Sequence, residues 1–369
     1  MKKVILSALL ATTFIGFTSC SSDDDNTTPE LPVTVSTGVF VLNEGNSYSG
    51  INGSLTSYDY VGNTATQNAY KTVNGNELGG TPNDAIVYGN KLYICSSDES
   101  MVFVANNISL KEVKRIETRN AAGDTKVMPR ELLAAGGKVY VSTYGNEVLA
   151  IDTLTLSVTA RYACGDNAEG MAISADGKTL YVANSDGYTA QGSISAINLT
   201  DGTTQTIANS GIKNPTRVFV VNGQVYFLDM GSYDANWTQI GEGLYRLTDN
   251  GSVKLAEASE VKYFAGKFYM YHARYGETAT YSVYDLPSGK ESTFIDGTDI
   301  AAPAAIGIDP ILGCVVITSY SMANGYADYS ADGYAVIYDA AGVKQGQFKT
   351  GVGPTTVIFN SAEVKYVAN

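Results

Sequence analysis

Apolar and polar positions alternate along most of the chain in short runs that end at glycine or asparagine, a pattern typical of β-strands joined by tight turns. One unit recurs, consisting of a short apolar run that usually follows proline, a glycine turn and an aromatic-rich strand. Its clear copies are residues 81–95, 128–142, 167–183 and 214–228, and its weaker copies are residues 258–271 and 302–318. The copies recur every ~40–50 residues, which is the spacing of four-stranded β-propeller blades.

The two ends of the chain predict how such a ring is completed. The first unit has strands at residues 38–43, 54–60 and near 65–72 but lacks an inner strand, and the chain ends with one further first-strand motif at residues 353–359. Pairing of this last strand with the N-terminal blade would close the ring and remove an exposed sheet edge. We therefore predict an all-β, seven-bladed β-propeller over residues 38–369.

The N-terminal segment predicts export. Two lysines and an apolar run precede Cys20, which predicts a secretory signal peptide over residues 1–19. The apolar run is too short for a mature transmembrane helix, which needs ~20 apolar residues. Residues 17–20 resemble a bacterial lipobox, which implies lipidation of Cys20. Residues 20–37 are expected to form an acidic, flexible tether. A transmembrane anchor and an unlipidated Cys20 are the alternatives.

Charge and cysteine usage narrow the possible partners. The formal net charge is −13, and loss of the two lysines in residues 1–19 would leave about −15. Such acidity argues against nucleic-acid binding, which needs clustered Lys and Arg. Beyond Cys20 the cysteines are Cys95, Cys164 and Cys314, without the paired spacing of a metal site. We expect buried free thiols, with one disulfide as the alternative.

The chain carries few groups of the kind that catalysis requires. It has a single histidine, His272, so a His-rich metal centre is excluded, and no nucleophile-elbow, phosphate-loop or dinucleotide motif is present. We predict neither an enzyme nor a cofactor or metal centre. A hydrolase using two carboxylates from Glu44, Glu131 and Glu169 is the alternative.

The loops between second and third strands predict the ligand-binding face. They share one end of a propeller with the entries to the first strands, and five of them are longer than a hairpin needs. They are rich in tyrosine and contain the only tryptophan, side chains that offer a large apolar face with a polar tip. Packing of these loops against one another is the alternative. The candidate ligand-binding residues are Asn43, Glu44, Tyr48, Asn83, Arg130, Tyr144, Glu169, Asn184, Tyr188, Arg217, Asp229, Tyr233, Trp237, His272, Tyr275, Tyr320 and Tyr326.

Several segments resemble a known group of proteins. Residues 38–46, 53–59 and 81–94 resemble the YncE-like propeller lipoproteins of Bacteroidetes, and the acidic run at residues 23–25 resembles their surface-export signal. The LNEG segment at residues 42–45 is similar to the BtuG family. This resemblance implies an outer-membrane, surface-exposed lipoprotein that captures cobalamin or a related corrinoid and hands it to a TonB-dependent transporter. A glycan-binding lipoprotein and a propeller that binds another protein are the alternatives.

Overall fold

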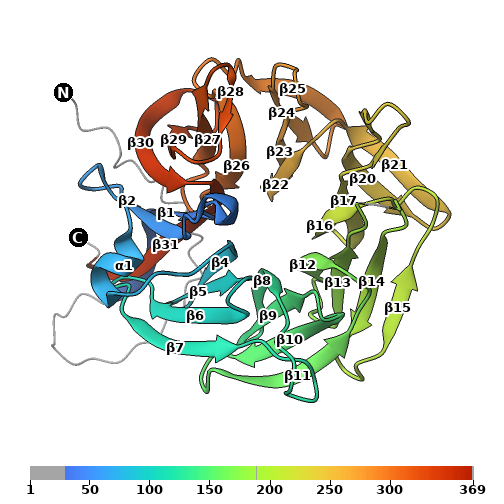
Figure 1. The fold of residues 1–369 in the computed structure, drawn as a ribbon, viewed down its shortest axis with the longest axis horizontal. Helices are drawn as coiled ribbons and strands as arrows, with labels where there is room; N and C mark the ends of the chain where they lie inside the picture. Colours follow the sequence, from blue (N-terminus) through green and yellow to red (C-terminus); the bar gives the residue numbers. More distant parts are fainter. Residues whose placement is uncertain (1–29, 188, 368–369) are drawn as a thin grey trace, which may run out of the picture.

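The computed structural model describes residues 30–187 and 189–367, and almost all regular structure in them is β. Antiparallel sheets stand side by side around a common centre (Figure 1). In the described residues there are seven sheets of four or more strands and one two-stranded hairpin. The predicted all-β class is confirmed, and the repeated four-stranded sheets are consistent with a propeller.

We number the larger sheets 1 to 7 along the chain and give the strands of each from its inner edge outward. Sheet 1 contains β31 (Pro354–Val367), β1 (Glu30–Asn43), β2 (Ser54–Asp59) and β3 (Thr64–Thr66). Sheet 2 contains β4 (Pro82–Tyr88), β5 (Lys91–Ser96), β6 (Met101–Asn106) and β7 (Glu112–Glu117). Sheet 3 contains β8 (Pro129–Ala135), β9 (Lys138–Thr143), β10 (Glu147–Asp152) and β11 (Ser157–Ala163). Sheet 4 contains β12 (Ala168–Ile173), β13 (Thr179–Asn184), β14 (Ser193–Asn198) and β15 (Thr204–Ile207).

The remaining sheets carry additional short elements in their loops. Sheet 5 contains β16 (Pro215–Val221), β17 (Gln224–Asp229), β20 (Gly243–Thr248) and β21 (Gly251–Ala256), with the hairpin β18 (Ser232–Tyr233) and β19 (Gln239–Ile240) inserted. Sheet 6 contains β22 (Glu260–Phe264), β23 (Lys267–His272), β24 (Thr280–Asp285) and β25 (Lys290–Ile295). Sheet 7 contains β26 (Ala302–Ile308), β27 (Val315–Ala323), β29 (Asp332–Tyr338) and β30 (Lys344–Val352), and β28 (Tyr326–Asp328) pairs with β27.

The hydrophobic core lies between neighbouring sheets. Tyr93 and Cys95 of β5 pack in one cluster with Val139 and Val141 of β9, all at most a few per cent exposed. Because both faces of such a second strand are covered, it reads as a continuous apolar run rather than an alternating one. The outer strand β7 has mainly exposed side chains, which explains its charged sequence.

A β-bulge interrupts the start of most inner strands. The register of the inner strand against the second strand shifts between Pro82 and Asp84, Pro129 and Leu132, Ala168 and Met171, Pro215 and Arg217, and Pro303 and Ala305. A bulge breaks the two-residue alternation and re-aims side chains. Consecutive residues at these positions can therefore both take part in polar clusters instead of pointing to opposite faces.

Sheet 1 differs from the sequence prediction in two places. β1 begins at Glu30 and pairs with β31 as far as Val367, so residues 30–37 form a strand where a flexible tether was predicted. Pro32 within this segment hid its alternating character. The third strand predicted near residues 65–72 is present as β3, which pairs with β2, but it ends at Thr66. Helix α1 (Ala69–Asn74), whose Tyr70 is buried, follows where the strand was expected to continue.

Two further sequence predictions concern the cysteines and the N-terminus. Cys95 is buried, Cys164 and Cys314 are half-buried, and all three are free thiols, as expected. No helix in the described residues is long and apolar enough to cross a membrane. The predicted signal peptide and the lipidation at Cys20 lie outside the described residues.

Candidate functional site

Exposed aromatic side chains gather at one end of the molecule. Because strands alternate in direction within each antiparallel sheet, the loops between second and third strands all leave the sheets at the same end. Among the side chains that the structure describes, every exposed aromatic belongs to one of these loops. They are Tyr48, Tyr144, Tyr233, Trp237, Tyr275, Tyr326 and Tyr329. We call this set the aromatic rim.

The aromatic rim is organised in pairs. The rings of Tyr275 and Tyr326, from the loops of sheets 6 and 7, are nearly parallel, with centroids 6.4 Å apart and an interplanar angle of 14°. Tyr233 and Trp237 lie 6.4 Å apart in the β18–β19 hairpin. Tyr320, which is half-buried, packs edge-on against Tyr329 at 4.8 Å. The rim thus presents several flat, amphipathic surfaces rather than scattered single rings.

The loop of Trp237 holds its side chain outward. Asp234 Oδ1 accepts hydrogen bonds from the backbone N–H groups of Asn236 (2.8 Å) and Thr238 (2.9 Å). Trp237 itself has φ 63°, a left-handed conformation that costs free energy for a large side chain. The indole is nevertheless 83% exposed, so burial of the ring does not compensate for that cost. Such strain at an exposed aromatic is typical of a binding site.

A charged cluster of inner-strand residues lies at the entry to sheets 2 to 4. The Arg130 guanidinium donates to both carboxylate oxygens of Glu169, at 3.2 and 3.3 Å, and lies 4.6 Å from the centre of the Tyr144 ring. The hydroxyl of Tyr144 also donates to Glu169. In the side-chain orientation of Asn83 that fits its hydrogen-bond partners, Oδ1 accepts from Arg130 Nη1 at 2.6 Å. These four predicted residues are therefore brought together, and we call them the Arg130 cluster.

Two carboxyl groups beside Arg130 are partly deprived of water. Burial raises the pKa of Glu169, although Arg130 and the Tyr144 hydroxyl oppose the shift. Burial also raises the pKa of Glu44, again against the charge of Arg130. Glu44 is held by its backbone N–H, which donates to the carbonyl of Gly353 at 2.6 Å. The predicted residue Glu44 is thus within reach of the Arg130 charge, without a hydrogen bond to it.

A second charged cluster surrounds Arg217 deeper among the inner strands. Arg217 on β16 forms ion pairs with Glu131 on β8 and with Glu260 on β22, the latter at 3.2 Å, and Lys262 contacts Glu260 at 3.5 Å. Together with Asp84, we call these residues the Arg217 cluster. A cavity of about 10 Å³, roughly one water molecule, is lined by the members of this cluster other than Glu131 and by residues of β26 and β31.

The acid–base state of the Arg217 cluster is unusual at Asp84. Burial and the neighbouring Glu131 raise the pKa of Asp84 to about 7, although the Leu132 N–H and Arg217 oppose the shift. Protein atoms surround its carboxyl, but the side chain is only half-buried because it borders the cavity. The pKa of Glu260 is lowered despite its burial, because Arg217 and Lys262 stabilise its charge.

Three predicted residues lie in the interior instead of on the ligand-binding face. Asn43, Asn184 and Asp229 are at most 2% exposed. Asn43 and Asn184 donate to serine side chains of their own sheets, and Asp229 accepts three backbone N–H groups. Each is the last residue of a second strand. Their polar atoms organise the loops, so they do not face a ligand in this structure, contrary to the sequence prediction.

The remaining predicted residues are less informative about a ligand. Tyr188 lies outside the described residues. His272 ends β23, its side chain is 15% exposed, and its Nε2 lies 3.0 Å from Glu242 Oε1. The sequence analysis did not place Asp84, Glu260 or Lys262 at the site. All three lie within the first three residues of inner strands, so an alignment of the repeats at this position could have identified them.

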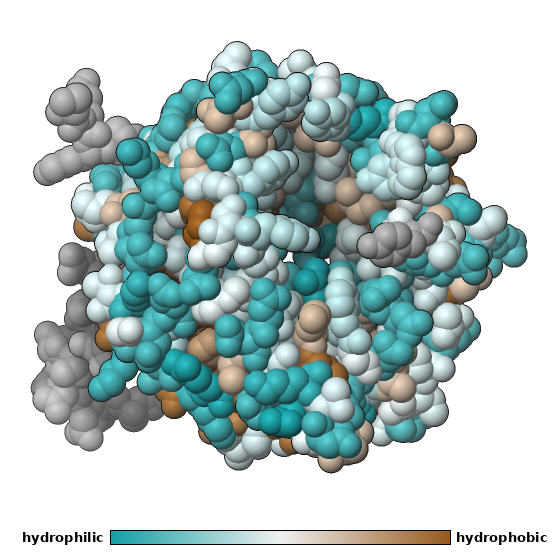
Figure 2. Space-filling view, in the orientation of Figure 1, coloured by the Kyte–Doolittle hydropathy of each residue, from teal (hydrophilic) through white to brown (hydrophobic). Residues whose placement is uncertain are grey.

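The view in Figure 2 shows a face that is hollowed at its centre, with hydrophilic residues in the hollow. A separate cavity of about 360 Å³ lies between the β1–β2 loop and α1. Lys71 and Glu77 on its wall form an ion pair at 2.6 Å. Its lining is mainly polar, whereas apolar and aromatic walls dominate most small-molecule sites.

Comparisons with known proteins give the fold and leave the function open. Residues 37–128 match the family model of a domain of unknown function, DUF5074. No curated protein matches the chain. Among solved structures, the chain is similar to dihydro-heme d1 dehydrogenase NirN in complex with DHE, with a TM-score of 0.52, 12% identity, and coverage of 86% of this chain and 74% of that one.

Weaker likenesses extend to two other structures. Kuenenia stuttgartiensis hydrazine synthase has a TM-score of 0.43 and 17% identity, with coverage of 86% of this chain and 90% of that one. The computationally designed protein Ika8 has a TM-score of 0.46 and 10% identity, with coverage of 75% of this chain and 95% of that one. At such identities a likeness concerns the fold and not the activity.

Proposed function

We propose that this chain is a surface-exposed, lipid-anchored receptor that captures cobalamin or a related corrinoid and hands it to a TonB-dependent outer-membrane transporter. The observation that carries the proposal is the aromatic rim: all described exposed aromatics lie at one end, around inner strands that carry charged clusters. Exposed aromatic side chains gathered at one end of a molecule are typical of a binding site.

The chemistry of the rim suits a corrinoid. A corrinoid is a wide, partly apolar disc fringed with amides. Aromatic pairs such as Tyr275 with Tyr326 offer flat surfaces for the disc and hydroxyl groups for its amides. The Arg130 cluster adds a guanidinium that can bind amide oxygens and a carboxylate that can bind amide N–H groups. Its groups are held by one another, so they are preorganised for a ligand.

The proposed receptor is a seven-bladed propeller in which sheets 1 to 7 are the blades and β31 closes the ring. Support comes from the pairing of β31 with β1, which places the last strand at the inner edge of the first sheet. Inner strands also contact one another in sequence, β31 with β4, β4 with β8, β8 with β12, β12 with β16, β22 with β26, and β26 with β31. The Arg217–Glu260 ion pair joins β16 to β22.

The proposed location rests on the N-terminal sequence. Lipidation at Cys20 would tether the chain to the outer membrane, and the acidic run at residues 23–25 would direct it to the surface. Contact with the membrane is then made by the lipid alone. A tethered binding protein with an aromatic mouth suits delivery to a transporter better than free diffusion would.

Titration with cyanocobalamin tests the proposal. Trp237 is the only tryptophan of the chain and belongs to the rim, so ligand binding should quench its fluorescence. Trp237→Ala should weaken binding, measured by calorimetry, by about 5–30-fold, the loss of ~1–2 kcal/mol expected for one aromatic contact. Leu154→Ala is the matched control, because Leu154 is 89% exposed in the β10–β11 turn at the opposite end. Absence of heat and of quenching at micromolar cyanocobalamin would refute the corrinoid proposal.

A glycan is the second candidate ligand, and the near-parallel Tyr275–Tyr326 pair favours it because flat aromatic surfaces also stack on sugar rings. Affinity electrophoresis in gels containing single polysaccharides separates the two proposals. A glycan receptor is retarded by one polysaccharide, and Tyr275→Ala abolishes the retardation. A corrinoid receptor migrates equally in all gels.

A further inference from the structure

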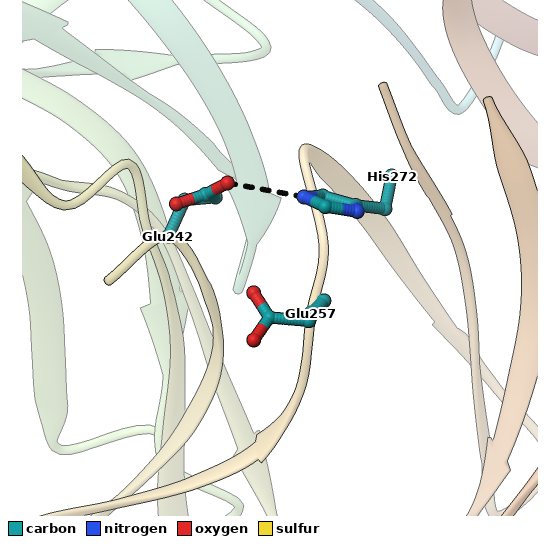
Figure 3. Close-up of side chains that lie close together, drawn as sticks. All are labelled: Glu242, Glu257 and His272. Atoms are coloured by element: carbon teal, nitrogen blue, oxygen red, sulfur yellow. Dashed lines mark hydrogen bonds and ion pairs between the residues drawn. The ribbon is translucent and has the colours of Figure 1, made fainter. Parts of the chain in front are cut away.

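Three potential metal ligands converge where sheets 5 and 6 meet. Glu242 precedes β20, Glu257 follows β21, and His272 ends β23, so two ligands come from sheet 5 and one from sheet 6. One donor atom of each lies within 4.8 Å of the other two. In Figure 3 the Glu242 carboxylate and the His272 ring face each other, and Glu257 approaches from the side. These residues play no part in the aromatic rim or in the two charged clusters.

Glu242 is an incompletely satisfied buried carboxylate. Its side chain is 0% exposed, and its Oε1 is contacted by His272 Nε2 at 3.0 Å and by Arg274 Nε. Its Oε2 is buried without a hydrogen-bond partner. Buried polar atoms are nearly always paired, so an orphaned carboxylate oxygen indicates a missing partner such as an ion or a water.

His272 is also unusual for its place in the fold. The last residue of the second strand, or its equivalent in β27, is a small polar side chain in the six other sheets. There it bonds within its own sheet or to neighbouring backbone, as in Asn43, Ser96, Thr143, Asn184, Asp229 and Ser319. Sheet 6 alone among the described sheets places an imidazole there, aimed at a carboxylate of the adjacent sheet.

We propose that Glu242, Glu257 and His272 form a binding site for a divalent transition-metal cation, with Zn²⁺ as the probe. Imidazole and carboxylate are ordinary Zn²⁺ ligands at about 2.0–2.2 Å in tetrahedral geometry, which places two ligand atoms about 3.3 Å apart. The observed 3.0 Å between His272 Nε2 and Glu242 Oε1 needs little change to admit the ion. Three protein ligands leave the fourth position open to water or to another ligand.

Two cationic side chains, Lys254 and Arg274, already contact the proposed ligands, but they do not prevent a metal ion from binding. Lys254 Nζ pairs with Glu257 Oε2 at 2.6 Å, but the two side chains are 30% and 53% exposed, so the pair contributes little to stability. Arg274 contacts the same oxygen, Glu242 Oε1, but its side chain is 29% exposed, so the guanidinium can move to the unpaired Oε2 when the ion takes its place at Oε1. The metal would tie sheet 5 to sheet 6 next to the β18–β19 hairpin of Trp237.

Zinc titration of the tag-free protein against a chromophoric chelator tests the site. We expect one Zn²⁺ per chain, and a rise in melting temperature with zinc because binding stabilises the native state. His272→Ala and Glu257→Gln should each weaken binding by about 10-fold or more, since even changes around a metal ligand have effects of that size. Glu277→Gln is the matched control: it removes an equal charge from the exposed loop after His272 and should leave zinc affinity unchanged.

The single histidine gives a second readout that does not depend on how a variant folds. In the wild-type protein, the imidazole NMR signals of His272 can be assigned without ambiguity, and zinc should shift them in proportion to the stoichiometric titration. Unshifted imidazole signals would overturn the proposal. It would equally be overturned if His272→Ala and Glu257→Gln bound zinc as tightly as Glu277→Gln.

Discussion

The Arg217 cluster lies on the inner strands and the aromatic rim on the loops that follow the second strands, and the side chains of the two regions are in opposite situations. Arg217 is bound on two sides by carboxylates from β8 and β22, and its exposed side-chain fraction is 24%. Trp237 and Tyr275 are 83% and 91% exposed and contact mainly other rim aromatics. Charged groups thus hold the inner strands together, whereas the aromatics remain available to a ligand.

This difference indicates that the Arg217 cluster contributes to stability, whereas the aromatic rim is available for ligand recognition. A side chain whose polar atoms are all engaged inside the protein contributes to folding and has little left for a ligand. An exposed aromatic contributes little to folding but gains free energy when a ligand covers it. Substitutions in the two regions should therefore have opposite consequences.

The largest expected effect is the loss of the central cation. Arg217→Met should lower the free energy of unfolding by about 3 kcal/mol, because it leaves Glu131 and Glu260 partly buried without their partner. Urea unfolding measures the change. Arg119→Met removes an exposed outer ion pair with Glu117 and should cost less than about 1 kcal/mol.

The pH dependence of the Arg217→Met defect provides a further check. Without the guanidinium the carboxylates can relieve their repulsion by taking up protons, so the defect should be smaller at pH 5 than at pH 8. If Arg217→Met lowered the free energy of unfolding by no more than Arg119→Met does, the Arg217 cluster would not hold the inner strands together. The two regions would then not differ in their contribution to stability.

A smaller effect, and of the opposite kind, is expected at the rim. Tyr275→Ala should change the free energy of unfolding by no more than about 0.5 kcal/mol, as is usual for exposed positions. It should weaken cyanocobalamin binding by about 10-fold through loss of one stacking surface. Tyr275→Phe keeps the ring and should bind nearly as well as wild type. A stability loss above about 1 kcal/mol would mean that the rim aromatics serve loop packing instead.

The sequence predicted the repeating strands well because both faces of each second strand are buried, which leaves a strong apolar signal such as that of residues 91–96. It missed α1, whose six residues are too few to show helical periodicity, and the strand at residues 30–37, where Pro32 masked the alternation. These elements depend on tertiary pairing with distant residues, which local pattern does not contain.

The residues of the candidate site also differ in how well the sequence predicts them, depending on whether they are exposed or lie in the interior. The exposed aromatics could be predicted because loop length and aromatic content are visible in the sequence. The interior positions of Asn43 and Asp229 could not be predicted singly, since a polar residue at a strand end can face solvent or bind backbone groups. Alignment of the repeats reveals a polar residue at the end of each second strand, or at the equivalent position Ser319 within β27, which indicates a shared structural role instead of a ligand contact.

An effect of similar size to that at the rim, but one that depends on pH, concerns the proton on Asp84. The pKa of its carboxyl is raised to about 7 in the folded protein, whereas the unfolded chain has an ordinary value, so the folded state holds this proton more tightly. Asp84 therefore favours folding below pH ~4 relative to higher pH, and this contribution is lost as the pH rises to 7. One pKa unit is worth about 1.4 kcal/mol. Because the side chain borders the cavity and is only half-buried, we expect ~1–2 kcal/mol in total.

Asp84→Asn removes this titration and keeps an oxygen for the Leu132 N–H, which Asp84 Oδ2 accepts at 2.8 Å. The variant should be more stable than wild type by ~1–2 kcal/mol at pH 8 and should have lost most of that advantage by pH 5. Urea unfolding across this range measures the difference between the two proteins, so pH effects common to both cancel. A constant difference from pH 5 to pH 8 would mean that Asp84 is ionised throughout, as a fully solvated carboxyl is. The inner cluster would then resemble the rim in its access to water, and the contrast between the two regions would be weaker.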